Sequence, residues 1–349
     1  MQMGGSKKLT EQVLAKDLCS ACGACVDLCP YFKAYNGKVA KIFDCDLTQG
    51  RCYTLCPKTG VDFEQLSQNY FQQSYNENPL GLYRRITAAK AGEKLGTGQF
   101  QNGGAVSALI THALKTGLVQ GAALTDSEGG NPVARLVSTA GEVLECASTK
   151  YMATPTIGCL NQAARDGHRN LGVVGTACQL TGVAQMRQNP LQKEGFEDPV
   201  GLTIGLFCTW SLDARKFKDL LAGKVDMETI IGMDVPPPPA EVFVIKTRKG
   251  TVKVPLNEIR AIVPKGCSVC PDMTAEWADI SVGALEGNPG WNTLIIRTEK
   301  GEQLVEKAVS EGHLVLDKFA AESLEHLNLG AGNKKKRAAG NVARETQCH

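Results

Sequence analysis

Residues 19–30 read CSACGACVDLCP, and this stretch organises the N-terminal part of the chain. Its four cysteines, Cys19, Cys22, Cys25 and Cys29, follow the spacing C-x2-C-x2-C-x3-C-P. This spacing is typical of bacterial ferredoxins, in which closely spaced thiolates bind an iron–sulfur cluster. In that pattern the fourth cysteine ligates the other cluster of a two-cluster module. The run therefore predicts a second group of cysteines further along the chain.

The second group consists of Cys45, Cys52 and Cys56, with Pro57 after the last of them. It is one ligand short of a regular motif, because Gln49 stands near the position of the missing cysteine. Under the ferredoxin crossing rule, the first cluster is held by Cys19, Cys22, Cys25 and Cys56. Cys29, Cys45 and Cys52 remain for a second cluster, which has either a non-cysteine or remote fourth ligand or the 3Fe–4S form.

Two other interpretations of this stretch are a disulfide-stapled secreted module and a zinc site. Residues 1–16 are polar and charged, unlike a signal peptide, and no apolar run is long enough to span a membrane. We therefore expect a cytoplasmic protein with reduced thiols, in which dense cysteine indicates a metal site. Zinc motifs rarely place a third cysteine three residues after the second and then close with Cys-Pro, so iron–sulfur is the preferred interpretation.

The overall composition favours an α/β protein with a small additional domain. The chain has 349 residues, 43% of them hydrophobic, which suits a substantial core and about two domains. Its 38 Lys and Arg nearly balance 36 Asp and Glu, whereas a nucleic-acid-binding protein needs a clustered basic face. The one basic run, residues 334–337, lies in a segment rich in Gly, Ala and Asn. We expect a flexible basic tail over 331–349, with docking onto an acidic partner as the alternative.

Strand and helix patterns alternate through most of the chain. We expect a ferredoxin-like iron–sulfur module at 1–60, a connector at 61–82 and the main core at 83–330. The alternation favours an α/β core, and a late hairpin turning at Lys249-Gly250 makes its sheet mixed. Strands are predicted at residues 84–91, 119–125, 133–139, 171–174, 200–207, 241–248, 251–255, 278–283 and 293–298.

Four further cysteines lie at the ends of predicted core elements. Cys178 is in a strand-to-helix turn, Cys208 ends a strand, and Cys267 and Cys270 form a C-x2-C pair. Ligand crevices form at the carboxyl ends of strands in α/β sheets, and a helix N-terminus favours a thiolate. These cysteines are enough for one 4Fe–4S cluster or one zinc ion, while Cys178 alone also fits a buried thiol or a nucleophile. Cys146 and Cys159 are expected as buried thiols and Cys348 as a free one.

A glycine-rich loop precedes the first helix of the core. The run Gly96-x-Gly98 is followed by Gln101 where the dinucleotide fingerprint would have glycine, so the fingerprint is absent. Gly103-Gly104 then opens a helix, and glycines at this position leave N–H groups exposed for a phosphate or form an ordinary tight turn. Further on, Lys150-Tyr151 offers a cation and a stacking ring, or is simply surface.

Six motifs in order resemble the family of coenzyme F420 hydrogenase/dehydrogenase beta subunits. They are residues 101–109 (QNGGAVSAL), 148–151 (STKY), 175–179 (GTACQ), 204–208 (IGLFC), 267–272 (CSVCPD) and 278–283 (ADISVG). With the ferredoxin-type stretch before them, the resemblance covers roughly residues 15–300. The sequence departs from the family pattern at Asn102, which replaces an acidic residue, and at Ala177, which replaces proline.

The resemblance implies an oxidoreductase that contains FAD and two to three 4Fe–4S clusters. FAD would be held by Gln101, Asn102, Gly103, Gly104, Ala105, Ser107, Lys150, Tyr151, Gly175, Thr176 and Ala177. Cys178, Cys208, Cys267 and Cys270 would hold the cluster beside it. Such a subunit exchanges hydride with a soluble carrier (F420 or NAD(P)H) at FAD, where the chemistry occurs without a catalytic side chain.

The same resemblance implies a partner for the single electrons. They would pass through the clusters to or from a partner redox subunit of a hydrogenase, formate dehydrogenase or heterodisulfide-reductase-like complex. The alternatives are a stand-alone, ferredoxin-dependent reductase of an organic substrate and a non-enzymatic zinc-binding assembly module. The sequence does not distinguish among the hydride carriers.

Overall fold

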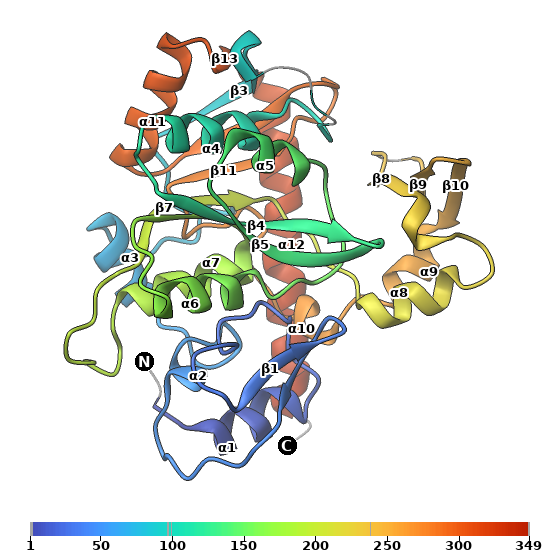
Figure 1. Cartoon of the computed structure of the whole chain (residues 1–349). Coiled ribbons are helices and arrows are strands. Elements are labelled where there is room, and N and C mark those ends of the chain that lie inside the picture. The colour runs from blue at the N-terminus through green and yellow to red at the C-terminus, as the bar shows by residue number, and fades with distance from the viewer. Residues whose placement is uncertain (1–2, 96–97, 99, 238, 348–349) are drawn as a thin grey trace.

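An eight-stranded mixed sheet forms the centre of the computed structural model, which describes residues 3–95, 98, 100–237 and 239–347 (Figure 1). The strand order is β13-β3-β12-β11-β7-β6-β4-β5. The strands are β3 (Arg85–Ala91), β4 (Gly121–Glu128), β5 (Asn131–Val137), β6 (Leu171–Thr176), β7 (Val200–Leu206), β11 (Ile280–Ala284), β12 (Asn292–Ile296) and β13 (Leu314–Asp317). Neighbours among β4, β6, β7 and β11 pair in parallel, and all other neighbours are antiparallel. The predicted mixed α/β sheet is therefore confirmed.

Helices cover both faces of this sheet, because its central strands are apolar on both sides. Along β6, Val173 belongs to the core on one face and Val174 to the core on the other. One face packs against α4 (Ala105–Lys115), α5 (Ala140–Glu145) and α11 (Glu299–Ser310). The other packs against α3 (Phe63–Phe71), α6 (Thr156–Arg165) and α7 (Ala177–Arg187).

The cysteine-rich segment forms a small unit beneath α6 and α7 (Figure 1). Its elements are α1 (Ser6–Leu9), the π-helical turn η1 (Thr10–Leu14), the hairpin β1 (Phe32–Tyr35) and β2 (Lys38–Lys41), and α2 (Arg51–Thr54). Asn161 on α6 fixes this unit to the core, because its Nδ2 donates to the carbonyls of Val26 (2.7 Å) and Ala24 (3.3 Å). Gly158 lies against Val26, where an added Cβ would approach within 2.9 Å.

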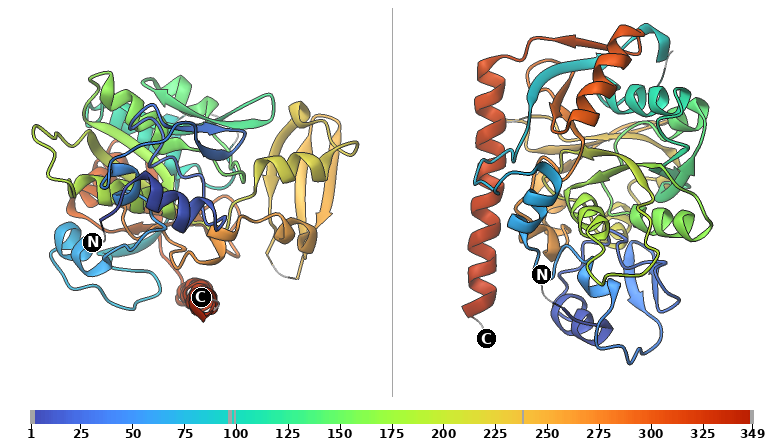
Figure 2. Two further views of the ribbon diagram at one scale, coloured as in Figure 1. Left: turned by 90° about the horizontal axis from the view of Figure 1, so that it is seen from below. Right: turned by 90° about the vertical axis from the view of Figure 1, so that its left-hand side faces the viewer.

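A second, three-stranded antiparallel sheet projects to one side (Figures 1 and 2). It consists of β8 (Ile230–Asp234), β9 (Val242–Thr247) and β10 (Gly250–Pro255), packed on α8 (Ala214–Leu221) and α9 (Leu256–Ala261). The predicted hairpin at Lys249-Gly250 is confirmed by the β9–β10 pairing. Because β8 to β10 form their own sheet, this hairpin is not what makes the central sheet mixed.

The C-terminal segment differs most from expectation. Residues predicted as a flexible basic tail belong instead to a long helix, α12 (Ala321–Gln347). It runs along one side of the molecule, from the end near β13 to the N-terminal unit (Figure 2). Ala331, Lys334 and Ala338 are buried, and their helical spacing places them on one face. Two small residues on this face let the helix lie close to the core.

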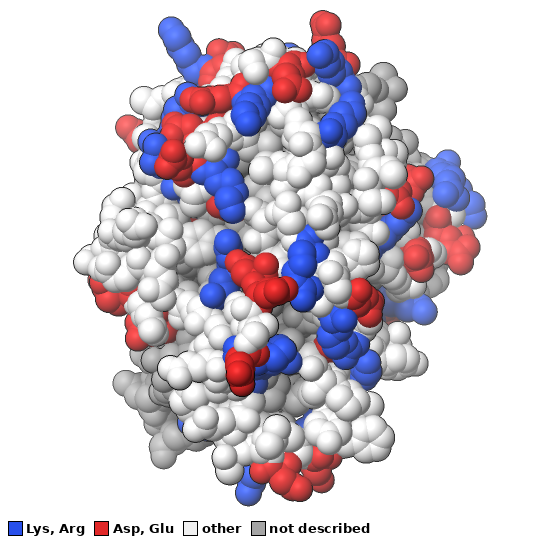
Figure 3. Space-filling model, turned by 60° about the vertical axis from the view of Figure 1, so that its left-hand side comes forward, with Lys and Arg blue, Asp and Glu red and all other residues white. Residues whose placement is uncertain are grey.

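The remaining surface is mixed in charge. On the face in Figure 3, Lys and Arg side chains are interspersed with Asp and Glu. Within the described residues, no helix combines the length and apolar character that a membrane span requires.

Candidate functional site

Four cysteines meet at the carboxyl ends of β6 and β7. These two strands are neighbours, with Thr176 opposite Leu206 at their ends. Cys178 follows β6 in the first turn of α7, and Cys208 follows β7 by two residues. The amide of Cys208 donates to the carbonyl of Met273 (2.8 Å), which brings the loop containing α10 (Lys265–Ser268), Cys267 and Cys270 to the same place.

The electrostatics of these thiols show that they face one another. Burial raises the pKa of Cys208 to about 12, and the thiols of Cys267, Cys178 and Cys270 contribute to the rise. Burial also raises the pKa of Cys178, with the Cys270 thiol as the next cause. Without compensation, four thiolates would be unstable here, so a positively charged centre would be needed to hold them.

Two lysines add positive charge beside this group, which we call the core thiol group (Cys178, Cys208, Cys267 and Cys270). Lys334 on α12 is only 3% exposed, and its Nζ donates to the carbonyl of Cys208 (2.5 Å). Burial would lower its pKa, but nearby thiolates, first Cys270 and Cys208, raise it above the usual value. For half-buried Lys58, burial likewise lowers the pKa, but the thiolates of Cys270, Cys178 and Cys267 raise it above the usual value. Sequence reasoning missed both lysines, and for Lys334 no local signal could have revealed its position.

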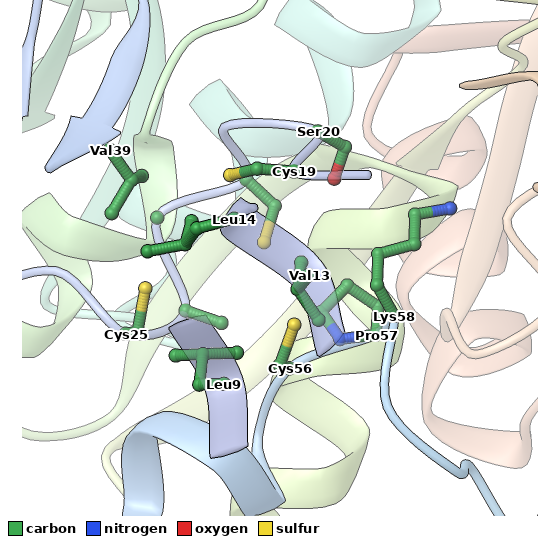
Figure 4. Close-up of a pocket in the computed structure, with 13 residues that line it drawn as sticks. Leu9, Val13, Leu14, Cys19, Ser20, Cys25, Val39, Cys56, Pro57 and Lys58 are labelled. Carbon is green, nitrogen blue, oxygen red and sulfur yellow. The ribbon is translucent and has the colours of Figure 1, made fainter. Parts of the chain in front are cut away.

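A second group, the inner thiol group, lies in the N-terminal unit. Cys19, Cys22, Cys25 and Cys56 line a small pocket, whose other walls include Leu9, Val13, Leu14 and Val39 (Figure 4). Burial raises the pKa of Cys25 well above its usual value, and the thiols of the other three members raise it further. For Cys22, the largest cause after burial is Cys178, so the inner and core thiol groups are adjacent.

The outer thiol group contains Cys29, Cys45 and Cys52. All three are half-buried. The pKa of Cys52 is raised to about 11, mainly by burial and further by the nearby thiols of Cys29 and Cys45. Cys52 also contributes to the shift at Cys25, so this group lies beyond the inner one. The three groups thus form a series from the sheet edge to the N-terminal unit.

Replacing Cys45 with serine tests the assignment of the outer group. If Cys29, Cys45 and Cys52 hold one cluster, Cys45→Ser should remove or alter one EPR signal and leave the signal of the inner group intact. The expected loss of iron is up to about three or four atoms per chain, the content of one cluster. Unchanged spectra and iron content would contradict the assignment.

The spacing of the sulfur atoms suits clusters better than single ions. Across the part of the chain that the structure describes, no three cysteine sulfurs lie within 4.8 Å of one another. Four thiolates at about 2.3 Å from one zinc ion would lie within roughly 4 Å of each other. An iron–sulfur cube holds its thiolates further apart, around a larger core. The lack of such a compact trio of sulfurs among the described residues argues against single zinc ions, and groups of three or four neighbouring thiols suit the ligand requirement of iron–sulfur clusters.

The glycine loop is held at the same edge of the sheet. Gly104 has φ of +74°, which favours glycine, and directly precedes α4. Gly103 is tightly packed, since an added Cβ would lie 2.8 Å from Asn292 Oδ1 and 2.9 Å from the Ala89 carbonyl. The amide of Ala105 donates to the same Asn292 Oδ1 (3.1 Å). Asn292 at the start of β12 thus positions the loop, although its distance in sequence hid this role.

The first predicted flavin residue, Gln101, contacts the small sheet. Gln101 Nε2 donates to the carbonyl of Met233 (2.9 Å) and to Asp234 Oδ1 (3.1 Å), both on β8. Asn102 is half-buried in the loop, and Ser107 is buried in α4. The loop therefore connects the central sheet with β8. The predicted Gly96 lies outside the described residues, as does Cys348.

Lys150 and Tyr151 contact different parts of the molecule. Lys150 Nζ donates to the carbonyls of Cys146 and Ala147 (2.7 Å each), and burial lowers its pKa. Tyr151 packs edge-on against Phe243 of β9, with ring centroids 5.1 Å apart. Burial raises the pKa of the Tyr151 hydroxyl, and Asp234 raises it further. The lysine is thus engaged with backbone carbonyls, while the ring belongs to the wall formed by the small sheet.

The turn from β6 into α7 contains Gly175, Thr176 and Ala177 and leads directly to Cys178 of the core thiol group. The amide of Thr176 donates to Gln179 Oε1 (2.7 Å), and its Oγ1 lies 3.5 Å from Cys178 Sγ. Gln179 Nε2 in turn donates to the carbonyl of Thr154 (2.8 Å), which draws the 150–156 segment to this turn. Of the other cysteines, Cys146 is buried as predicted, whereas Cys159 is only half-buried.

Comparisons with known proteins identify related sequences. Residues 86–161 and 168–322 match the family models for the N-terminal part and the C terminus of the coenzyme F420 hydrogenase/dehydrogenase beta subunit. The coenzyme F420 hydrogenase subunit beta of Methanococcus voltae is 32% identical over 244 residues, 68% of this chain and 85% of that protein. A subunit of the F420H2 dehydrogenase of Methanosarcina mazei is 29% identical over 315 residues, 88% of this chain and 86% of that protein.

A solved structure shows the same fold. A chain of the F420-reducing [NiFe] hydrogenase complex from Methanosarcina barkeri superposes with a TM-score of 0.72 at 25% identity, covering 78% of this chain and 96% of that chain. Residues 1–85, which include the inner and outer thiol groups, lie outside both family models.

Proposed function

Because the chain belongs to the family of coenzyme F420 hydrogenase/dehydrogenase beta subunits, we propose that it is a flavin- and iron–sulfur-containing electron-transfer subunit of an oxidoreductase. The observation that carries this proposal is the series of three thiol groups, which begins at the same edge of the central sheet as the glycine loop. Neighbouring groups in the series affect each other electrostatically: Cys178 raises the pKa of Cys22, and Cys52 raises the pKa of Cys25. This order provides a continuous route from the sheet edge to the N-terminal unit.

The residues at the sheet edge suit FAD. Gly103-Gly104 and the first turn of α4 would receive its phosphates, and Tyr151 with Gly175–Ala177 would border its rings. Bound there, FAD supplies exchange of a hydride with a soluble two-electron carrier, F420 or NAD(P)H, and release of single electrons to a neighbouring cluster. The chain contributes orientation and burial, since the small sheet closes over one side of this edge.

The core thiol group would hold the cluster nearest to this edge. Its four thiolates add negative charge to a buried place, and Lys58 and Lys334 offset that charge. A nearby cation favours the reduced, more negative state of a cluster, so these lysines would raise its reduction potential.

The outer thiol group lies where a partner redox subunit would exchange electrons. Half-buried Cys45 is flanked in sequence by Ile42, Phe43 and Leu47, three large apolar side chains that are exposed. Exposed apolar side chains close to a redox group suit a protein interface. We infer a partner of the hydrogenase, formate dehydrogenase or heterodisulfide-reductase-like class.

Cofactor content tests the proposal directly. Anaerobically purified protein should release FAD on extraction and contain about 8–12 iron atoms per chain, the content of two or three cubes. Its flavin absorbance should bleach with one of F420H2, NADH and NADPH added separately, which identifies the hydride carrier. Protein that contains only zinc, or that releases no flavin after anaerobic purification, would contradict the proposal.

A further inference from the structure

A separate polar group lies at the other end of α4 from the glycine loop. His112 is in the last turn of α4, Glu311 directly follows α11, and His313 directly precedes β13. Since His112 follows Gly104 by eight residues along α4, this group is roughly 12 Å from the Gly103-Gly104 end of the helix. None of the three residues belongs to the thiol groups or to the proposed flavin edge.

The three side chains converge. One ligand atom from each lies within 4.8 Å of the others. His112 Nδ1 is 3.6 Å from Glu311 Oε2, which is too long for a good hydrogen bond. The two imidazole rings are 5.1 Å apart between centroids and inclined by 49°.

Both imidazoles are buried, and three of their four ring nitrogens are buried without a hydrogen-bond partner. His112 is 1% exposed and His313 is 4% exposed. Both nitrogens of His112 and Nδ1 of His313 lack a partner, whereas buried polar atoms in proteins are normally paired. These unpaired ring nitrogens are available for coordination.

This donor set has a known chemistry. Two histidine nitrogens and one carboxylate are a ligand set that proteins use for zinc, with a fourth position left for water. We propose that His112, Glu311 and His313 form a binding site for a divalent cation of the zinc class. Glu311 is half-exposed, so its carboxylate can move onto an ion that arrives from solvent. The bound ion would join the end of α4 to the connection between α11 and β13.

The charges around the three side chains affect how tightly this site would bind a cation. Lys115 and Lys307 face His112, and Lys94 and Lys115 face His313. These cations oppose binding, but all three are exposed, so water and salt screen them. Glu311 supplies negative charge to both histidines, and its removal should therefore weaken binding strongly.

Zinc binding to the full-length, cluster-loaded protein tests the proposal. After incubation with zinc and desalting, wild-type protein should retain about one zinc per chain by elemental analysis, with its iron content unchanged. Zinc should also raise the midpoint of thermal unfolding. Glu311→Gln should weaken zinc binding by more than about tenfold, because replacing a residue that merely hydrogen-bonds to a metal ligand already lowers metal affinity by that factor. Glu306→Gln, which replaces an exposed glutamate on α11 one turn before Glu311, is the matched control.

Two results would overturn the proposal. The first is wild-type protein that retains no more zinc than Glu311→Gln. The second is zinc that remains bound in both Glu311→Gln and His313→Gln, because that ion would lie elsewhere, for example on free thiols. If His313→Gln does not fold, Glu311→Gln alone still decides the test. The Glu311 side chain is half-exposed, so its substitution leaves the core intact.

Discussion

Replacing Cys178 with serine should stop electrons from a hydride donor at the sheet edge and keep them from the N-terminal clusters. The variant should lose about four iron atoms per chain, the content of one cube, and retain FAD. Cys178 is expected to matter most because it belongs to the core thiol group and also lies beside Cys22 of the inner group. Its loss would break the series at its first step.

Rapid mixing with the hydride donor separates the reduction of the flavin from the later reduction of the N-terminal clusters. In the variant, flavin absorbance should still bleach, while reduction of the N-terminal clusters, followed by EPR, should fall to background. Cys159→Ser is the control, because Cys159 is half-buried on α6 and outside all three thiol groups. If Cys178→Ser keeps its iron and its rate of cluster reduction, the proposed route is wrong.

Replacing Arg297 with methionine should cause the largest loss of stability. Its buried guanidinium donates to the carbonyls of Leu80 and Leu82 (2.8 Å each) and to Ser281 Oγ (2.7 Å), and it also bonds to Thr274. It therefore attaches the 61–82 connector to the central sheet. Removing one partner from a buried charged network typically costs about 3–5 kcal/mol of unfolding free energy. We expect the thermal midpoint to fall by on the order of 5–10 °C.

This loss should grow with pH. Burial raises the pKa of Glu276 to about 7, with Asp272 as the next cause, while Lys335 and Arg297 lower it. A carboxyl group whose pKa is raised in the folded state stabilises that state most below its unfolded pKa, and this contribution is lost as pH rises through about 7. Without Arg297 the charged form of Glu276 is disfavoured further. The deficit should therefore be larger at pH 8 than at pH 6.

Thermal unfolding followed by circular dichroism, under anaerobic conditions at both pH values, measures these effects. The control is Arg84→Met, which removes an exposed arginine paired with Glu302 (2.8 Å) and should cost no more than about 1 kcal/mol. Equal midpoints for Arg297→Met and Arg84→Met would show that the network does not hold the connector.

The strands of the core were predictable because their signals are local. Apolar runs between glycine turns located β3, β6 and β7 to within about two residues, and the β9–β10 hairpin turned where Lys249-Gly250 indicated. Cysteine spacing also predicted the inner and outer thiol groups, whereas the family resemblance was needed to predict that Cys178 and Cys208 join Cys267 and Cys270. The order of the three groups in space was not accessible, because contacts such as Cys22 with Cys178 depend on how α6 and the N-terminal unit pack.

The helix α12 shows why the rest was hidden. Its buried face consists of Ala331, Lys334 and Ala338, so the usual apolar stripe of a packed helix is missing from the sequence. The neighbouring Lys335 pairs with buried Glu276 (2.9 Å), a contact that only the folded chain reveals. A basic, alanine-rich and glycine-rich segment therefore resembled a solvated tail, although tertiary contacts fix it against the core.

The position of Lys334 also bears on access to the core thiol group. All four members of the group precede it in the chain, and the last of them, Cys270, lies 64 residues before Lys334. Until α12 packs, this helix does not cover Cys208, whereas afterwards the Lys334 ammonium lies against the Cys208 carbonyl. If this group holds the proposed cluster, insertion before α12 packs is the route that does not require the helix to move.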